Sequence, residues 1–413
     1  MNLFVVSRSL SEEIKDNSET KRLKNFPKIL GMNIGKKHYD DESYQKDLSR
    51  NDIVILGFYR EWEKSRNTNI KEVSQRLKRL NPNIMIGQYT ILNEFTDNIF
   101  DQAKRDIIEK LNKENWWLLD EKKKKLQWTP RYNAWEVNFT EYTQVDSGKM
   151  RFPEWLAERN YNVFFKNNPY FDIWYIDNLF YKPRVEKADW KNIHKNESSS
   201  SEEIQRAYRK GYMAYLEKAK QLSPQLLYIV NADSELNYEE YRNQFHGAFL
   251  EGLMGYSWSL ETWAGWARMM ERYHSVFENL LPPKIVGFHA TGDPKDRKFV
   301  RYALTSCLMN NGYFSFTDKW NEYSSVAWLE EFDLDLGSPI EEPKRKPWRE
   351  HVYRREFEKG VVYVNPGMKP YLLKLEKNMK LACCSEKKIE NGKDEKKIIL
   401  NPKDGLILMK IDE

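Results

Sequence analysis

The sequence is poor in cysteine and has no long hydrophobic run. Its three cysteines are too few for a disulfide framework, and we interpret the adjacent Cys383 and Cys384 as packing residues. No segment approaches the roughly 18 apolar residues of a membrane helix. The N-terminus, MNLFVVSRSLSEEIK, lacks the cationic leader of a secretory signal. As written, the sequence therefore predicts a cytoplasmic protein with no membrane partner, or a secreted one if a leader has been removed.

An excess of charge of one sign and the common cofactor motifs are also missing. Lysine and arginine total 67 against 62 aspartates and glutamates, so the net charge is only +5, and no basic stripe marks a nucleic-acid partner. The chain has no G-x-G-x-x-G, H-E-x-x-H or G-x-S-x-G motif and no zinc-like spacing of cysteine and histidine. We therefore expect neither a metal nor an organic cofactor.

Short apolar segments, each followed by a helical pattern, dominate the first 320 residues. They are nearly continuously apolar, as parallel strands buried on both faces should be. Their ranges are 28–35, 52–59, 83–90, 171–178, 225–233, 246–252, 284–292 and 312–318. Eight strands alternating with helices predict an α/β fold, a (β/α)8 TIM barrel within residues 1–345 whose core spans about 26–335.

Two intervals between these strands have a clear helical pattern, and one interval is unusually long. Apolar residues recur every four positions in 98–113. A serine run ending SSSSEE supplies the N-cap and the acidic first turn of a predicted helix at 203–222. The long interval, at about 92–170, predicts an insertion over the mouth of the barrel. The alternative is that WEVNF, which begins at residue 135, is itself a barrel strand.

The pattern changes in the last part of the chain. Residues 338–349 carry three prolines and alternating charges, which is typical of a linker. Short apolar segments at 360–366, 370–376, 379–384, 396–402 and 405–411 then follow, separated by N-P, N-G and D-G turns. These features predict a small all-β sandwich domain at 346–413.

Carboxylates stand where barrel strands end. Asp177 ends the fourth strand and Glu251 the sixth, and barrel enzymes build their active sites at that end. Glycoside hydrolysis needs two such groups, because one must be ionised at the anomeric centre while the other donates a proton to the leaving oxygen. The 14 tryptophans, 24 tyrosines and 20 phenylalanines suit stacking on sugars. We expect further substrate contacts from Asp40, Glu94, Asn178, Asp233, Trp258, His289 and Asp318.

Both candidate catalytic carboxylates have a structural alternative. Asp177 could cap a helix or pair with Arg184, and Glu251 could pair with Arg242 or Arg268. If they are catalytic, donors from the following asparagine and the charge of Arg184 should hold the pKa of Asp177 low. The apolar neighbours of Glu251 should raise its pKa.

The sequence resembles a family catalogued as hypothetical glycosyl hydrolases, number fifteen of that series, over most of the chain from about residue 28. The resemblance rests on FDIWYIDNLFYKPR, HGAFLEG, ALTSCLMNNGYFSFTD and RREFEKGVVYVNP. It implies a barrel glycosidase with a β-sandwich behind the barrel. The placement of Asp177 and Glu251 is similar to that of the nucleophile and the acid/base in α-galactosidases and dextranases. Glycosidase groups that place the general acid after strand five would instead indicate Asp233 as the acid.

These observations predict a retaining glycoside hydrolase that acts on an oligo- or polysaccharide. Asp177 would be the nucleophile and Glu251 the general acid/base, with no cofactor, because both half-reactions need only displacement and proton transfer. One alternative is a non-catalytic carbohydrate-binding barrel. Another is a metal-dependent polysaccharide deacetylase that uses His38 with Asp40 or Asp41. A carbohydrate is the expected partner, and the sequence indicates no particular oligomeric state.

Overall fold

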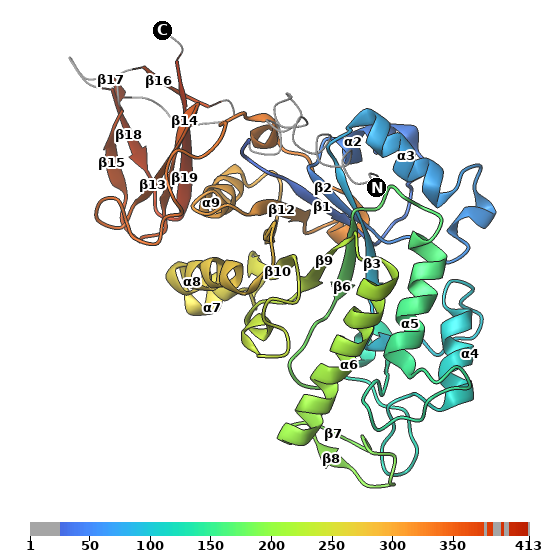
Figure 1. Ribbon diagram of the computed structural model, residues 1–413. Helices are drawn as coiled ribbons and strands as arrows, with labels where there is room; N and C mark the ends of the chain where they lie inside the picture. The colour runs from blue at the N-terminus through green and yellow to red at the C-terminus, as the bar shows by residue number, and fades with distance from the viewer. Residues whose placement is uncertain (1–24, 376–377, 383–389, 392–395, 412–413) are drawn as a thin grey trace, which may run out of the picture.

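The computed structural model describes residues 25–375, 378–382, 390–391 and 396–411. Cys383 and Cys384 lie outside the described residues, as do the first 24 residues of the predicted barrel domain. Figure 1 shows a large α/β part and, beside it, a smaller part made of β-strands near the C-terminus. No helix within the described ranges is long and apolar enough to cross a membrane.

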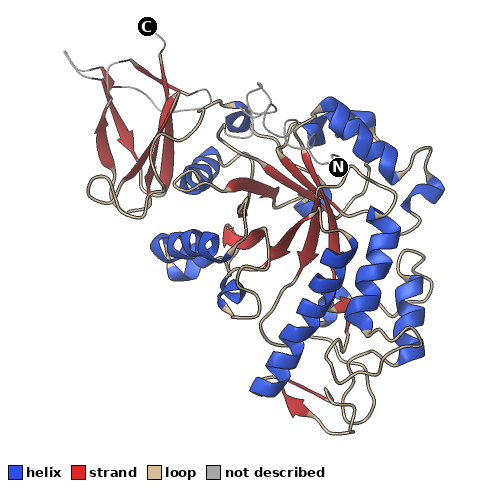
Figure 2. Cartoon of the chain, viewed as in Figure 1, coloured by secondary structure: helices blue, strands red, loops and turns tan. Residues whose placement is uncertain are grey.

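The large part is built on one eight-stranded parallel sheet. Its strands are β1 (Leu30–Asn33), β2 (Ile53–Leu56), β3 (Met85–Ile91), β6 (Ile173–Asp177), β9 (Leu227–Asn231), β10 (Gly247–Met254), β11 (Ile285–Gly292) and β12 (Tyr313–Asp318). They pair in chain order, and a parallel bridge between Ile29 and Phe314 closes the sheet. Each overlaps one of the eight predicted segments, although β3 and β10 extend one and two residues beyond theirs. The predicted (β/α)8 barrel is therefore confirmed, and Figure 2 shows helices outside the strands.

The strands are apolar on both faces because each face is buried against a different core. Alternate residues such as Ile53, Ile173 and Phe249 form one cluster, which fills the barrel. Their neighbours, among them Val54 and Trp174, pack with residues of the surrounding helices in a second, larger cluster. This double burial explains the continuous apolar runs, which a sheet with one solvated face would not show.

The helices largely follow the predicted pattern. They are α2 (Glu42–Ser49), α3 (Ile70–Leu80), α4 (Arg105–Glu114), α5 (Phe152–Asn160), α6 (Glu202–Leu222), α7 (Leu260–Ala264), α8 (Trp266–Val276) and α9 (Arg297–Cys307). The helix predicted at 203–222 is confirmed in α6. The one predicted at 98–113 begins only at Arg105, because turns at Asn98 and Asp101 precede it and Ile99 stays 37% exposed.

The long interval between β3 and β6 folds over the carboxyl ends of the strands. It contains α4, α5 and a two-stranded antiparallel sheet of β4 (Glu94–Phe95) and β5 (Trp135–Glu136), which pair with each other and not with the barrel. The alternative that WEVNF is a barrel strand is therefore wrong. A second two-stranded pair, β7 (Lys187–Ala188) and β8 (Glu197–Ser198), follows β6.

The C-terminal strands form two antiparallel sheets. One contains β13 (Tyr353–Phe357), β14 (Gly360–Asn365), β19 (Asp404–Lys410) and β16 (Met379–Leu381), and the other β15 (Tyr371–Lys374), β18 (Lys396–Leu400) and β17 (Glu390–Asn391). Buried side chains from both sheets, including Tyr363, Leu373 and Leu406, form one core between them. The sequence did not indicate β13, whose RREF segment is mostly charged. The domain boundary at residue 345 stays a prediction.

The first of these sheets packs directly on the barrel through α9. Arg301 of α9 forms an ion pair with Asp404 at 3.3 Å. Arg355 of β13 is fully buried and donates hydrogen bonds to the carbonyls of Leu308 and Asn310, just after α9. The Arg301 ion pair ties β19 to the barrel, and the hydrogen bonds of Arg355 tie the centre of β13 to it, so β13 is held where its sequence alone would leave it exposed.

Removal of residues 350–413 should destabilise the barrel. Phe357, Val362 and Ile407 share a core with barrel residues, and each large buried side chain contributes about 1.5–3 kcal/mol. Because 1 kcal/mol shifts Tm by about 2–4 °C in domains of a few hundred residues, we expect a loss of about 5 °C or more, or aggregation, by calorimetry. A truncated protein that melts like the full chain would contradict this expectation.

Candidate active site

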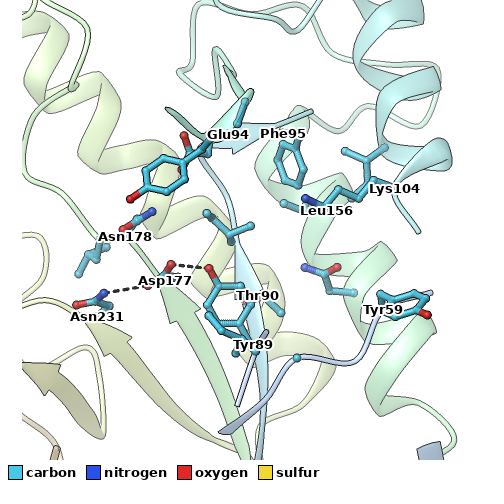
Figure 3. A pocket seen from close by; sticks show the side chains of 18 of the residues that line it. Tyr59, Tyr89, Thr90, Glu94, Phe95, Lys104, Leu156, Asp177, Asn178 and Asn231 are labelled. Atoms are coloured by element: carbon cyan, nitrogen blue, oxygen red, sulfur yellow. Dashed lines mark hydrogen bonds between the residues drawn. The ribbon is translucent and has the colours of Figure 1, made fainter. Parts of the chain in front are cut away.

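A cavity of about 1100 Å³ opens at the carboxyl ends of the barrel strands. The ends of β3, β6, β9 and β10 form its floor, and the insertion between β3 and β6 supplies much of its wall. Figure 3 looks into this cavity and shows Asp177 and Asn231 side by side, with Tyr89 next to them. The active site of a barrel enzyme is expected at this end.

The two candidate catalytic carboxylates are held by a single amide group. Asn231, the last residue of β9, donates from Nδ2 to Asp177 Oδ1 at 2.9 Å and to Glu251 Oε2 at 2.8 Å. Placed end to end, these two bonds give the greatest distance possible between the two oxygens, 5.7 Å. Asp177 and Glu251 therefore face one another from two strands that flank β9 in the barrel.

A bend in β10 turns Glu251 toward the cavity. The register between β10 and β11 shifts after Leu250. Gly252 then adopts a φ of +70°, and its Cα approaches the Trp258 ring so closely that a Cβ would lie 1.9 Å from it. Its backbone N–H donates to Nδ1 of His289 at 3.3 Å. Only glycine suits this position, which combines a left-handed backbone with a close approach.

Two tyrosines complete the network around the carboxylates. The Tyr89 hydroxyl donates to Asp177 Oδ2, and the Tyr323 hydroxyl donates to Glu251 Oε1 at 2.6 Å. With the shared Asn231, each carboxylate thus has one side-chain donor on each oxygen. Hydrogen bonds of this kind fix the orientation of both groups before a substrate arrives.

The pKa of Asp177 differs from the prediction. Burial at the cavity floor and the nearby charge of Glu251 raise the pKa of Asp177 to about 6, although hydrogen bonds from Tyr89, Asn231 and the next backbone N–H oppose that rise. The predicted low pKa is wrong because burial and the charge of Glu251 outweigh these hydrogen bonds, and because the expected cation, Arg184, pairs with other carboxylates. Above about pH 6 the group is ionised, so it is a carboxylate at neutral pH.

The arginines that could have served as structural partners are engaged elsewhere. Arg184 lies between Glu94, at 3.1 Å, and Glu136, at 2.6 Å. Arg268 pairs with a glutamate of its own helix, and Arg242 donates to a backbone carbonyl. The simplest structural explanations for Asp177 and Glu251, an ion pair with one of these arginines, therefore do not hold.

Four residues predicted to contact the substrate line the cavity, namely Glu94, Asn178, Asp233 and Trp258. Asn178 follows β6 with a φ of +57°. Asp233 forms an ion pair with Arg272 at 2.7 Å. Trp258 is 56% exposed and stacks on Tyr256, with ring centroids 4.6 Å apart. An exposed indole that is held in place by stacking on a second ring is a suitable surface for a sugar ring.

The other three residues predicted to contact substrate do not line the cavity. Asp40 pairs with Arg66. His289 is completely buried and its Nε2 lies 2.9 Å from the hydroxyl of Thr317; burial lowers its pKa to about 4, so the ring is neutral. Asp318 accepts a hydrogen bond from a backbone N–H two residues further on. These three roles stay predictions.

Sequence reasoning missed the side chains that organise the pair. Asn231 is the last residue of β9, as Asp177 is the last residue of β6. The sequence-based prediction instead named Asp233, which lies two residues beyond β9. Its position at a strand end, equivalent to that of Asp177, is a signal that identifies Asn231 as a candidate site residue. Tyr89 and Tyr323 gave none, because nothing local distinguishes them from the other tyrosines of this aromatic-rich chain.

The alternative metal motif does not assemble. Asp41 caps α2 by accepting two backbone hydrogen bonds, and Asp40 is paired with Arg66. No group of three metal-ligating side chains occurs among the residues that the structure describes. The side chains on which a metal-dependent deacetylase would depend, including His38, therefore do not form a candidate centre.

The barrel, with its facing acidic side chains at the carboxyl ends of the strands, has the architecture of a glycoside hydrolase. Residues 78–361, more than two-thirds of the chain, match the hypothetical glycosyl hydrolase family 15. The chain belongs to this family and is a glycoside hydrolase, so the predicted membership and enzyme class are confirmed.

Other comparisons concern the fold. The α-amylase from H. orenii is similar, with a TM-score of 0.51 and 9% identity over 93% of this chain and 99% of that one. The glycoside hydrolase domain of PelA from Pseudomonas aeruginosa has a TM-score of 0.44 and 13% identity, over 74% of this chain and all of that one. Comparison with curated proteins gives no significant match.

Proposed function

We propose that this protein cleaves a glycosidic bond of an oligo- or polysaccharide with retention of anomeric configuration. The observation that carries the proposal is the single Asn231 amide bonded to both Asp177 and Glu251, which limits those oxygens to a separation of 5.7 Å. Retaining glycosidases place their two carboxyl groups about 5–5.5 Å apart, whereas inverting ones need about 6.5–9.5 Å to admit a water. The limit supports retention.

In the proposed reaction, Asp177 attacks the anomeric carbon and Glu251 protonates the departing oxygen. A covalent bond forms between Asp177 and the sugar while the glycosidic bond breaks, and the proton of Glu251 leaves with the alcohol. Glu251 then removes a proton from water, which attacks the same carbon and releases Asp177. The hydrogen bonds from Tyr89 and Asn231 hold the attacking carboxylate in place, which reduces the reorganisation needed in each step.

The assignment of roles is supported by the hydrogen bonds at each carboxylate. Asp177 accepts from Tyr89, from Asn231 and from the backbone N–H of Asn178, three donors that favour its ionised form. Glu251 accepts from Tyr323 and shares Asn231. The carboxylate with more hydrogen-bond donors suits the nucleophile, which must be ionised, and the other suits the group that exchanges a proton.

The stereochemical outcome tests the proposal. Aryl glycosides of several sugars, in both anomeric forms, identify a cleaved substrate, and proton NMR during its hydrolysis shows which anomer appears first. We expect the first product to have the configuration of the substrate. Early appearance of the opposite anomer would contradict retention, even if Asp177 and Glu251 were both essential.

The pH dependence of kcat/KM should distinguish the two roles. Because the pKa of Asp177 is raised to about 6, a nucleophilic Asp177 must lose its proton, and kcat/KM should fall below about pH 6. If Asp177 were the acid, activity should instead fall above that pH. Tyr89→Phe removes a donor to the carboxylate, so it should move the acid limb to higher pH, whereas Tyr170→Phe, outside the cavity, should leave the limb in place.

A further inference from the structure

The charges that line the cavity are divided into two halves. The ends of β6, β9 and β10, the segments that follow them and the two-stranded sheet β4–β5 contribute five carboxylates and one cation, Arg184. The segments after β1 and β2, together with α4 and α5, contribute four cations and, among the described residues, no carboxylate. These four are Lys37, Arg60, Lys104 and Arg159, and we call this side the basic half. The catalytic pair belongs to the other side.

Lys104 has the least compensated charge of the basic half. It lies at the N-cap position of α4 and is only partly exposed. Among the described residues its ammonium group forms no ion pair or hydrogen bond. Lys37 lies close enough that burial and the charge of Lys104 both lower its pKa, and its ammonium donates to the carbonyls of Ile34 and Gly35, each at 2.8 Å. Two like charges thus share one wall of the cavity.

The two arginines of the basic half are compensated from behind the wall. Arg159 makes two hydrogen bonds to Asp106, at 2.9 and 3.1 Å, and Arg60 approaches the same carboxylate at 3.4 Å. Asp106 does not line this cavity. Arg60 also lies 3.9 Å from Glu61, but that carboxylate pairs with Lys64 at 2.9 Å. Two carboxylates among these three cations leave net positive charge, which adds to that of the two lysines. An anion bound in the basic half would relieve this repulsion.

An aromatic ring stands beside the cations. Tyr59 follows β2 and lines the cavity, and its hydroxyl makes no hydrogen bond with another described side chain. Figure 3 shows Tyr59 and Lys104 across the cavity from Asp177 and Asn231. A ring face for a sugar and a cation for a charged substituent are thus both available within one cavity, away from the reacting bond.

We propose that the basic half, through Lys104, Lys37 and Tyr59, is a subsite for an acidic sugar unit, so that the substrate is an anionic glycan. This inference rests on the proposed function, because it assumes that a glycan occupies the cavity. The charged substituent is a carboxylate, as in a uronic acid, or a sulfate ester. Both present oxygens that a lysine ammonium can bind, and a low-dielectric cavity strengthens that contact.

Calorimetric titration with free sugars tests the subsite without any need for hydrolysis. The probes are D-glucuronate and D-galacturonate for the carboxylate, glucose 6-sulfate for the ester, and glucose and galactose as neutral parents, all at one ionic strength. We expect at least one acidic sugar to bind tenfold or more tightly than its parent. Lys104→Ala should reduce that affinity about tenfold or more, the size of one charge-assisted hydrogen bond, while Lys104→Arg should keep most of it.

Lys113→Ala is the matched control, since Lys113 lies on the same helix with a 73% exposed side chain and should not affect binding. The subsite is refuted if no acidic sugar binds more tightly than its parent, or if Lys104→Ala changes nothing. It is also refuted if inorganic sulfate binds as tightly as the acidic sugars, since the site would then hold a bare anion. An active Asp177→Ala variant would instead refute the catalytic proposal and leave these affinities unchanged.

Discussion

Replacing Asp177 with alanine should abolish turnover of every glycoside, whatever its leaving group. Without the carboxylate no covalent intermediate can form, and the pocket then retains only binding and proton donation. We expect kcat/KM to fall by at least about 10⁴-fold, measured with the substrate that wild type cleaves best. Asp177→Asn should be equally inactive, because an amide of the same shape keeps the contact with Asn231 but cannot attack.

Azide should partly restore activity to Asp177→Ala. The anion is small enough to enter the space left by the side chain and can attack the anomeric carbon from that side. A single displacement gives a glycosyl azide of inverted configuration, which NMR identifies. Folding is checked by circular dichroism. If Asp177→Ala keeps near-wild-type activity, or if azide yields a product of retained configuration, Asp177 is not the nucleophile.

Replacing Glu251 with alanine should affect substrates according to their leaving groups. Natural glycosides need a proton on the departing oxygen, so kcat/KM should fall by about 10²–10⁴-fold. A dinitrophenyl glycoside needs no such proton, so its kcat/KM should change little while kcat falls, because no base activates water in the second step. Rapid mixing should then show a burst of released phenol.

Azide gives the opposite stereochemistry in this variant. With Asp177 intact, the intermediate still forms, and azide attacking it yields a glycosyl azide of retained configuration. Asp233→Ala is the matched comparison, since Asp233 lines the same cavity but is paired with Arg272. If Asp233→Ala shows the leaving-group dependence and Glu251→Ala does not, the acid/base role belongs to Asp233.

The agreement between sequence and structure is closest where burial is uniform. All eight barrel strands were predictable because a parallel strand covered on both faces must be apolar along its whole length. The strand β13 was not predictable, because three of the five residues of Tyr353–Phe357 are charged. Its central Arg355 is buried only because carbonyls after α9 accept its hydrogen bonds. The start of α4 was also misplaced, because local turns at Asn98 and Asp101 compete with the periodic pattern.

By itself, the sequence determined the barrel, the position of its strand ends and the presence of Asp177 and Glu251 at two of them. Those features follow from local hydrophobicity and from the rule that parallel strands end at the same edge. Only the tertiary structure decided that Asn231 bridges the two carboxylates, that Arg184 is engaged by Glu94 and Glu136, and that Lys104 faces the same cavity. Such contacts join residues that are distant in the chain. Charge and burial at a site depend on these neighbours in space, not on the residues adjacent in sequence.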